Sequence, residues 1–126
     1  MRVDIIGSAA EVEQKNVAGK NVAVIDVLRA TTVMITALMN GATEIVATRE
    51  VDEAIKHYSK YGKNQAMLGG ERNAVRIEGF HLANSPFEYN EETVKGKAIV
   101  MTTTNGTRAI EGSLAAKDIV DRKSVV

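Results

Sequence analysis

Residues 22–48 read VAVIDVLRATTVMITALMNGATEIVAT, and this stretch decides the fold class. Residues 22–25 are short, apolar and rich in β-branched side chains, which predicts a buried strand. Residues 30–40 have the length of a helix, and Gly41 follows them as a typical C-terminal cap. Residues 42–48 then read as another strand. A strand, a helix and a strand in succession predict a parallel βαβ unit.

The same alternation continues along the chain with one interruption. We expect further strands at residues 3–6, 66–68, 98–101 and 118–120, and helices at residues 51–61, 91–94 and 106–114. Residues 69–96 break the period with glycines, acids and the single proline, and a connection of this length is often functional. The expected fold class is therefore α/β, with a mostly parallel sheet flanked by helices in a layered sandwich.

Length and composition narrow the classes of partner. The 126 residues make one domain at most, and 44% of them are hydrophobic, which is enough for a real core. Sixteen basic and 16 acidic residues balance without a basic stripe, so we expect no nucleic-acid partner. The lack of cysteine excludes thiolate nucleophiles and Cys-based zinc sites. With neither a signal peptide nor a long apolar window, we expect a cytoplasmic protein with no membrane partner.

The first chemical motif lies directly after the strand at residues 22–25. The junction between a strand's carboxyl end and a helix's amino end is where open α/β sheets bind ligands, and anions in particular. Asp26 could bind Mg²⁺ beside a phosphate, or it could only cap the next helix. Arg29 could clamp a phosphate, or it could be a solvated loop charge. Thr31 and Thr32 could cap the helix and also donate to phosphate oxygens.

The second motif is TTTNGTR at residues 102–108, again directly after an expected strand. Three successive hydroxyl side chains followed by Asn-Gly can present several donors to one anion, and the glycine permits close backbone approach. A plain Asn-Gly turn would not need the three threonines before it, so we favour a ligand site. The candidate phosphate-binding residues here are Thr103, Thr104, Asn105, Gly106, Thr107 and Arg108.

Two further segments fall in or beside the interrupted region. Glu71 follows the expected strand at residues 66–68; it could share a metal with Asp26 or act as an acid or base. Arg72 could bind phosphate. The alternative is that residues 69–72 form an exposed turn with an internal ion pair. Asn84 and Ser85 could bind substrate, or they could only cap and rigidify a turn before the proline.

Several common phosphate-binding devices are absent from the sequence. There is neither a P-loop nor a Gly-x-Gly-x-x-Gly motif, and Leu28 stands where haloacid-dehalogenase-type phosphatases place a second aspartate. If the protein is a phosphatase, we therefore expect water activated or oriented by Mg²⁺ to be the nucleophile.

Five segments, taken in order, resemble the 2-phosphosulfolactate phosphatase family: residues 25–32, 68–72, 77–80, 84–86 and 102–108. The resemblance implies a Mg²⁺-dependent acid phosphatase that hydrolyses 2-phosphosulfolactate, a small phosphorylated organic acid, to sulfolactate in coenzyme M biosynthesis. It also implies an α/β fold of two similar halves with the active site between them. Asp26 and Glu71 would then hold Mg²⁺ and orient water, and Arg29 would complete the catalytic set. The expected substrate-binding residues are Arg72, Asn84, Ser85, Thr103, Thr104, Asn105, Gly106, Thr107 and Arg108.

The chain departs from the family pattern in two ways. His81 stands where an acidic residue is expected. Family members are also much longer, so we expect residues 1–120 to be the amino-terminal half of a two-part protein, and a homo-oligomer is left open. We expect residues 121–126 to be a non-native tail, because they read like a translated sequencing adapter and do not continue the strand at 118–120. The alternative function is a non-catalytic domain that binds a phosphorylated metabolite, or an inactive fragment.

Overall fold

The computed structural model describes residues 2–26 and 29–122. The strands are β1 (Asn21–Ile25), β2 (Glu44–Thr48), β3 (Ala66–Arg72), β4 (Val75–Arg76), β5 (Ala98–Thr102) and β6 (Asp118–Arg122). The helices are α1 (Gln14–Val17), α2 (Ala30–Met39), α3 (Val51–Tyr58), α4 (Glu91–Val94) and α5 (Gly106–Gly112), with 3-10 turns η1 (Ala9–Glu11) and η2 (Pro86–Glu88). No helix within the described ranges is long and apolar enough to cross a membrane.

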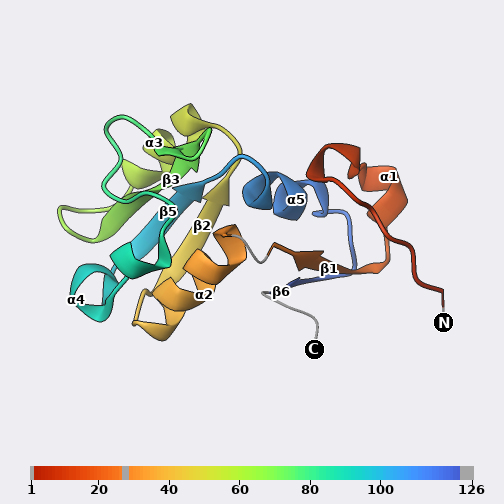
Figure 1. Ribbon diagram of the computed structural model, residues 1–126, viewed down its shortest axis with the longest axis horizontal. Helices are drawn as coiled ribbons and strands as arrows, with labels where there is room; N and C mark the ends of the chain where they lie inside the picture. The colour runs from red at the N-terminus through yellow and green to blue at the C-terminus, as the bar shows by residue number, and fades with distance from the viewer. Residues whose placement is uncertain (1, 27–28, 123–126) are drawn as a thin grey trace.

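The main sheet has the strand order β2-β5-β3-β4 (Figure 1). Strands β2, β5 and β3 run parallel, and β4 pairs with β3 in an antiparallel hairpin. Strand β5 is buried at every position, as expected for the centre of a parallel sheet. Its side chains alternate: Ile99 and Met101 pack with α2 on one face, while Val100 packs with Ala54 of α3 on the other. The expected α/β sandwich is therefore confirmed.

The helices covering the sheet follow the sequence pattern closely. Helix α2 ends as predicted, because Gly41 has φ +90° and the N–H groups of Gly41 and Ala42 bond back to Leu38 and Ala37. Helix α3 begins where the carboxylate of Glu53 accepts the N–H of Glu50 (3.4 Å). It ends three residues earlier than residue 61 because the chain tightens into single turns after Tyr58.

A second, two-stranded sheet lies beside the main one, formed by β1 and β6 in parallel. Helix α5 lies between the two sheets and contacts both β1 and β2 (Figure 1). The prediction that β1 belongs to the main sheet is therefore wrong. The apolar pattern shows that residues 22–25 form a strand, but it does not specify the strand with which they pair.

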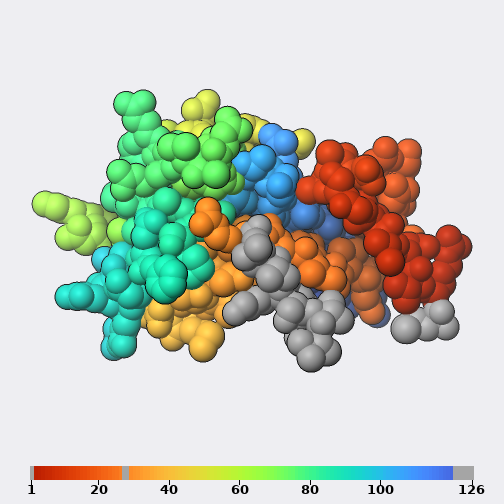
Figure 2. Space-filling model, viewed as in Figure 1, coloured from red at the N-terminus to blue at the C-terminus, as the bar shows by residue number. Residues whose placement is uncertain are grey.

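Three other expectations about strands are corrected. Residues 3–6 form no strand, and Val3 and Ile5 are largely exposed. Residues 69–72 are not a turn but continue β3, with Gly70 paired to Thr102. Strand β6 continues through residues 121 and 122, which pair with Val24 and Ile25 of β1; residues 123–126 lie outside the described residues. The residues before β1, which include α1, lie together at one end of the molecule (Figure 2).

Gly106 is the point where the two motifs of the sequence meet. A Cβ atom at this position would lie 2.5 Å from the Cβ of Ala30 and 2.8 Å from Oδ2 of Asp26. Glycine therefore allows the start of α5 to approach the junction between β1 and α2. This contact connects the two sheets at the carboxyl ends of β1 and β5.

We predict that Gly106→Ala destabilises the protein by about 1–3 kcal/mol, because the added methyl group must displace Ala30 or Asp26. Gly7→Ala is the matched control, since nothing lies within 4 Å of a Cβ there. Urea unfolding of both variants beside the unsubstituted protein measures the difference. An unchanged unfolding midpoint for Gly106→Ala would contradict the close approach.

Candidate functional site

A pocket of about 280 Å³ opens where the carboxyl ends of β3 and β5 lie side by side. We call it the β3–β5 pocket. Its walls come from the start of α2, the β3–β4 hairpin, the segment before η2 and the loop after β5. The lining residues are Arg29, Glu71, Asn73, Ala74, Asn84, Thr104 and Asn105. The structure thus brings residues from all four segments that the sequence singled out into one pocket.

The carboxylate of Glu71 joins two walls of this pocket. Its Oε1 accepts the backbone N–H (3.0 Å) and the hydroxyl (2.9 Å) of Thr104, and its Oε2 accepts the N–H of Ala74 (2.8 Å). Burial alone would raise the pKa of Glu71, but these hydrogen bonds and the nearby charge of Arg72 outweigh it and lower the pKa below its ordinary value of 4.5. Glu71 is therefore ionised at neutral pH and holds both walls.

The hairpin between β3 and β4 forms an edge of the pocket. Asn73 (φ 53°) and Ala74 (φ 64°) both adopt the left-handed conformation, as a two-residue hairpin turn requires. Alanine is unfavourable there, and the bond from the Ala74 N–H to Glu71 helps hold it in place. Local strain of this kind tends to occur at binding sites. Sequence reasoning missed both residues because Asn-Ala, unlike Asn-Gly, does not signal a turn of this type.

The backbone next to Asn84 is held in place at the opposite wall. The preceding residue, Ala83, donates its N–H to Oε2 of Glu88 (2.7 Å) and accepts the hydroxyl of Tyr89 at its carbonyl (2.7 Å). Tyr89 is fully buried, and burial together with the charge of Glu88 raises the pKa of its phenol. Asn84 is only 7% exposed, and its Oδ1 is buried with no hydrogen-bond partner in the described part of the chain. Such atoms are rare in folded proteins and call for a partner.

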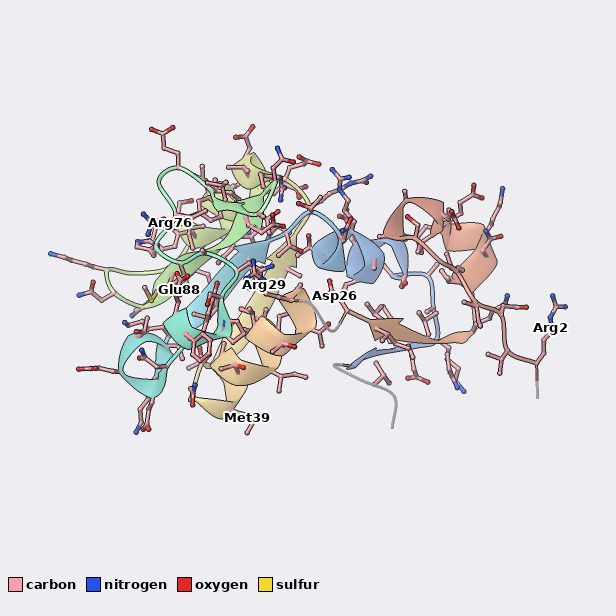
Figure 3. All side chains as sticks on the ribbon, in the orientation of Figure 1. Arg2, Asp26, Arg29, Met39, Arg76 and Glu88 are labelled. Carbon is pink, nitrogen blue, oxygen red and sulfur yellow. The ribbon has the colours of Figure 1, made fainter. Side chains whose placement is uncertain are left out.

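Arg29 supplies the positive charge of the pocket. It precedes α2 directly, and Figure 3 shows it at the amino end of that helix, with Asp26 at the end of β1. Its exposed guanidinium forms no ion pair or hydrogen bond with residues 2–26 or 29–122. The positive end of the α2 dipole lies at the same place. Arg29 and the helix end together favour an anion in the β3–β5 pocket.

The threonines at the end of β5 and in the loop after it hold that loop in shape. Thr102 donates its hydroxyl to the carbonyl of Arg49 (3.1 Å), and Thr104 donates its hydroxyl to Glu71. Thr103 and Thr107 are buried and bonded to each other: the Thr107 hydroxyl donates to the Thr103 carbonyl (3.0 Å), and the Thr107 N–H donates to the Thr103 hydroxyl (3.3 Å). The loop therefore presents Asn105, rather than a row of hydroxyls, to the pocket.

Other predicted residues lie away from this pocket. Arg72 donates to the carbonyls of Glu71 (3.0 Å) and Arg49 (2.8 Å) and to the Thr102 hydroxyl (2.9 Å), so it supports the end of β3. Arg108 is exposed on α5, and Ser85 is half-buried; neither lines the pocket.

His81 has a structural role. Its Nδ1 accepts the N–H of Leu68 (2.9 Å), and its ring packs 5.4 Å from that of Tyr58.

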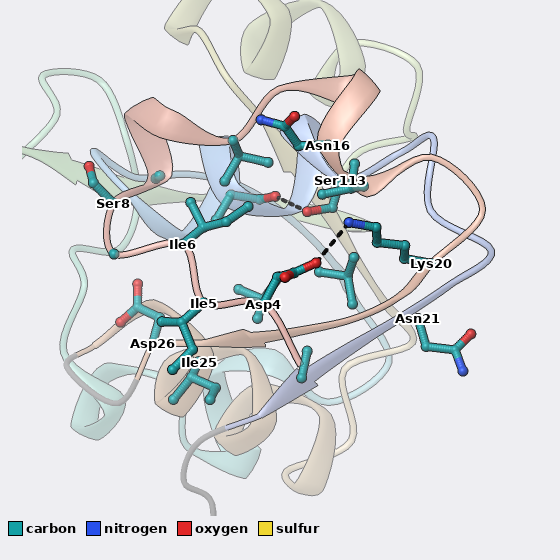
Figure 4. A pocket seen from close by; sticks show the side chains of 18 of the residues that line it. Asp4, Ile5, Ile6, Ser8, Asn16, Lys20, Asn21, Ile25, Asp26 and Ser113 are labelled. Carbon is teal, nitrogen blue, oxygen red and sulfur yellow. Dashed lines mark hydrogen bonds and ion pairs between the residues drawn. The ribbon is translucent and has the colours of Figure 1, made fainter. Parts of the chain in front are cut away.

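Asp26 and Gly106 line a second, larger cavity of about 1120 Å³, which we call the β1 pocket. Figure 4 shows it between the residues before η1, β1 and α5, with Asp26 at one end and the ion pair of Asp4 with Lys20 (3.0 Å) further in. Asn105 lines both pockets. The two predicted metal ligands, Asp26 and Glu71, thus face different cavities that meet at this asparagine.

This arrangement limits how the residues could hold a magnesium ion. Among residues 2–26 and 29–122 there is no group of three or more His, Asp or Glu side chains suited to a metal. The oxygens of Glu71 already accept three hydrogen bonds. Mg²⁺, however, often takes one carboxylate and completes its shell with waters and phosphate oxygens. The half-buried Asp26 fits that mode.

Comparison with known proteins identifies the family. The chain matches the 2-phosphosulpholactate phosphatase family model over residues 7–121. The chain belongs to this family. It is 52% identical over 120 residues to a probable 2-phosphosulfolactate phosphatase of Clostridium acetobutylicum, with 95% of this chain and 51% of that protein covered. Relatives of the same name from Clostridium novyi and Clostridium tetani are 49% and 52% identical over the same shares. The chain spans about half the length of these curated relatives.

We predict that the hydrogen bonds accepted by Glu71 make the free energy of unfolding depend on pH. Because its pKa is lowered on folding, Glu71 contributes stability above about pH 4.5, and that contribution is lost as the pH falls through the lower folded value. Glu71→Gln should lower stability by roughly 1–3 kcal/mol at pH 7 and flatten the acid limb of the stability curve.

Urea unfolding from pH 7 to pH 3 measures this effect. Glu78→Gln is the control, since Glu78 is exposed. Parallel curves for Glu71→Gln and the unsubstituted protein would show that the carboxylate does not join the two walls.

Proposed function

We propose that this chain carries the anion-binding part of a Mg²⁺-dependent acid phosphatase. Its substrate is 2-phosphosulfolactate or a closely related small phosphorylated acid, and hydrolysis yields sulfolactate and phosphate in coenzyme M biosynthesis. Membership of the family supports the proposal. The structural observation that carries it is the β3–β5 pocket, where Arg29 at the start of α2 meets the loop after β5.

In this proposal the chain's own residues bind and orient the substrate. Arg29 neutralises an anionic group of the substrate with its planar fork of donors. The side-chain amide of Asn105, where the two pockets meet, donates to a phosphoryl oxygen on the side of Asp26. Glu71 acts as a positioning residue that holds Thr104 and the hairpin, so that the donors are in place before substrate arrives.

Mg²⁺ would be held by Asp26, with waters and phosphate oxygens completing its shell. When bound, it neutralises charge on the phosphoryl group and lowers the pKa of a coordinated water. Asp26 lies against Gly106 at the start of α5, which keeps its carboxylate next to Asn105.

We predict that Asp26→Asn lowers Mg²⁺-dependent phosphate release by at least ~100-fold, because it removes the charged ligand while keeping its shape. The measurement is phosphate release from 2-phosphosulfolactate with Mg²⁺ and with EDTA, on the protein expressed from the complete gene. Saturable binding without turnover in the unsubstituted protein would favour the binding-domain alternative. Normal turnover and normal Mg²⁺ dependence in Asp26→Asn would remove Asp26 from the site.

We predict that Arg29→Ala raises KM and weakens inhibition by inorganic phosphate, each by at least ~10-fold, with a smaller effect on kcat. Lys56→Ala is the control, because Lys56 is an exposed cation on α3 and does not line the pocket. Steady-state kinetics of the two variants distinguish a local clamp from the general effect of losing a positive charge. Equal KM values for both variants would contradict the assignment of Arg29.

A further inference from the structure

The chain contains two Asn-Gly pairs, Asn40-Gly41 and Asn105-Gly106. In such a pair the backbone nitrogen of the glycine can attack the side-chain amide of the asparagine, because glycine has no Cβ to obstruct the approach. The attack requires a side-chain amide that is free to turn and a glycine N–H that is not held by an acceptor. The structure meets these requirements at one pair and not at the other.

Both reacting groups are held at Asn40-Gly41. The amide nitrogen of Asn40 donates to the carbonyl of Tyr89 (2.8 Å), and Asn40 is half-buried. The N–H of Gly41 donates to the carbonyl of Leu38 (3.1 Å) at the end of α2. Attack by Gly41 would have to break both hydrogen bonds, so the fold protects this pair.

Neither reacting group is held at Asn105-Gly106. Asn105 is exposed, and its side chain forms no hydrogen bond with residues 2–26 or 29–122. The N–H of Gly106 also has no acceptor within these ranges, as is usual for the first residue of a helix. The two groups are therefore free to meet at this pair.

The packing of α5 requires the glycine of the reactive pair. A Cβ at position 106 would lie 2.5 Å from the Cβ of Ala30, so a residue with a side chain would not fit there without a shift. Asn105, for its part, lines both the β3–β5 pocket and the β1 pocket, where its amide offers neutral donors. The close approach of α5 thus fixes the one neighbour that leaves this amide most open to attack.

We propose that Asn105 is a deamidation site and that its conversion to a carboxylate weakens anion binding in the β3–β5 pocket. The nitrogen of Gly106 forms a bond to Cγ of Asn105, the Cγ–Nδ2 bond breaks, and Nδ2 leaves as ammonia with the proton from Gly106. Water then opens the cyclic imide: its hydroxyl adds to one of the two ring carbonyls, and its hydrogen goes to the ring nitrogen. The product is aspartate or isoaspartate, and either is ionised at neutral pH.

The new carboxylate changes the pocket in two ways. It replaces a hydrogen-bond donor by a group that only accepts, and it adds a negative charge to the pocket in which Arg29 favours an anion. This loss of anion binding rests on the proposed function, in which the amide of Asn105 donates to a phosphoryl oxygen. The modification itself does not, because it depends only on the two groups that react.

The test follows both pairs in one sample by peptide mass mapping of the chain during incubation in mildly alkaline buffer. Asn105 is expected to lose its amide at least ~10-fold faster than Asn40, in line with the hydrogen bonds that must open at Asn40. In concentrated urea the two rates should come within about 3-fold of each other, because unfolding removes that protection. Equal rates in the folded chain, no loss at Asn105, or a difference that persists in urea would overturn the assignment.

Variants test the effect on the pocket. Asn105→Asp should bind inorganic phosphate at least ~10-fold more weakly than the unsubstituted chain. Asn64→Asp is the matched control, because it adds the same charge at an exposed residue that does not line the pocket. Asn105→Gln keeps an amide but would have to close a larger ring, so its phosphate affinity should stay constant during an incubation that weakens the unsubstituted chain.

Dissociation constants from NMR titration with inorganic phosphate measure these effects. Equal phosphate affinity in Asn105→Asp and Asn64→Asp would overturn the effect on the pocket. An equal decline on incubation in Asn105→Gln and the unsubstituted chain, or no detectable phosphate binding before incubation, would overturn it as well.

These outcomes are separable from those of the proposed function. Faster amide loss at Asn105 than at Asn40, in a protein that releases no phosphate from 2-phosphosulfolactate, would support the deamidation site and reject the phosphatase. Phosphate release by a protein in which Asn105 keeps its amide as long as Asn40 does would do the reverse.

Discussion

The carboxylate of Glu71 is the interaction on which the pocket depends. It accepts three hydrogen bonds, two from Thr104 and one from Ala74, and so ties the loop after β5 to the β3–β4 hairpin. Among the described residues, no other hydrogen bond joins the loop after β5 directly to the β3–β4 hairpin. Without the carboxylate, the Thr104 and Ala74 N–H groups would lose their acceptor, and the left-handed Ala74 would lose its support. A residue suited by type to acid–base or metal chemistry acts here as a support.

Different residues hold the pocket in shape and line its interior. Thr102, Thr104 and Arg72 direct their donors inward, to Arg49, Glu71 and one another. Arg29, Asn84 and Asn105 are left to line the pocket. This division agrees with the general behaviour of precise sites, in which the groups that touch a ligand are held by a second layer of hydrogen bonds.

Much of the fold could be predicted from the sequence, because the local patterns are strong. The apolar run of β5, the period of α3 and the glycine that ends α2 each have one ready interpretation. The pairing of the strands was harder to predict, because the apolar pattern of β1 does not reveal that it pairs with β6 and not with the main sheet. The predicted strand at residues 66–68 stops before Gly69 and Gly70, since glycine weakens strands, yet both continue β3 and make room for Tyr89 and for the Thr102 carbonyl.

The candidate site could be predicted at the level of segments but not of atoms. The sequence placed Arg29, Glu71 and Thr104 directly after strands, and the structure brings them together with Asn84 in the β3–β5 pocket. It could not show whether a hydroxyl points inward or outward, since spacing fixes the position of a side chain but not its hydrogen-bond partner. Arg72 and Arg29 were equal candidates by type, and only the contacts of Arg72 with Thr102 and two carbonyls distinguish them.

We propose that this chain binds an anion in the β3–β5 pocket and not in the larger β1 pocket. Titration of the chain with inorganic phosphate, followed by backbone amide NMR shifts, distinguishes the two pockets. Anion binding in the β3–β5 pocket should give saturable shifts centred on Arg29, Ala74, Asn84, Thr104 and Asn105. Shifts centred on Ile5, Ile6 and Lys20 of the β1 pocket, or no saturable shifts at all, would contradict it.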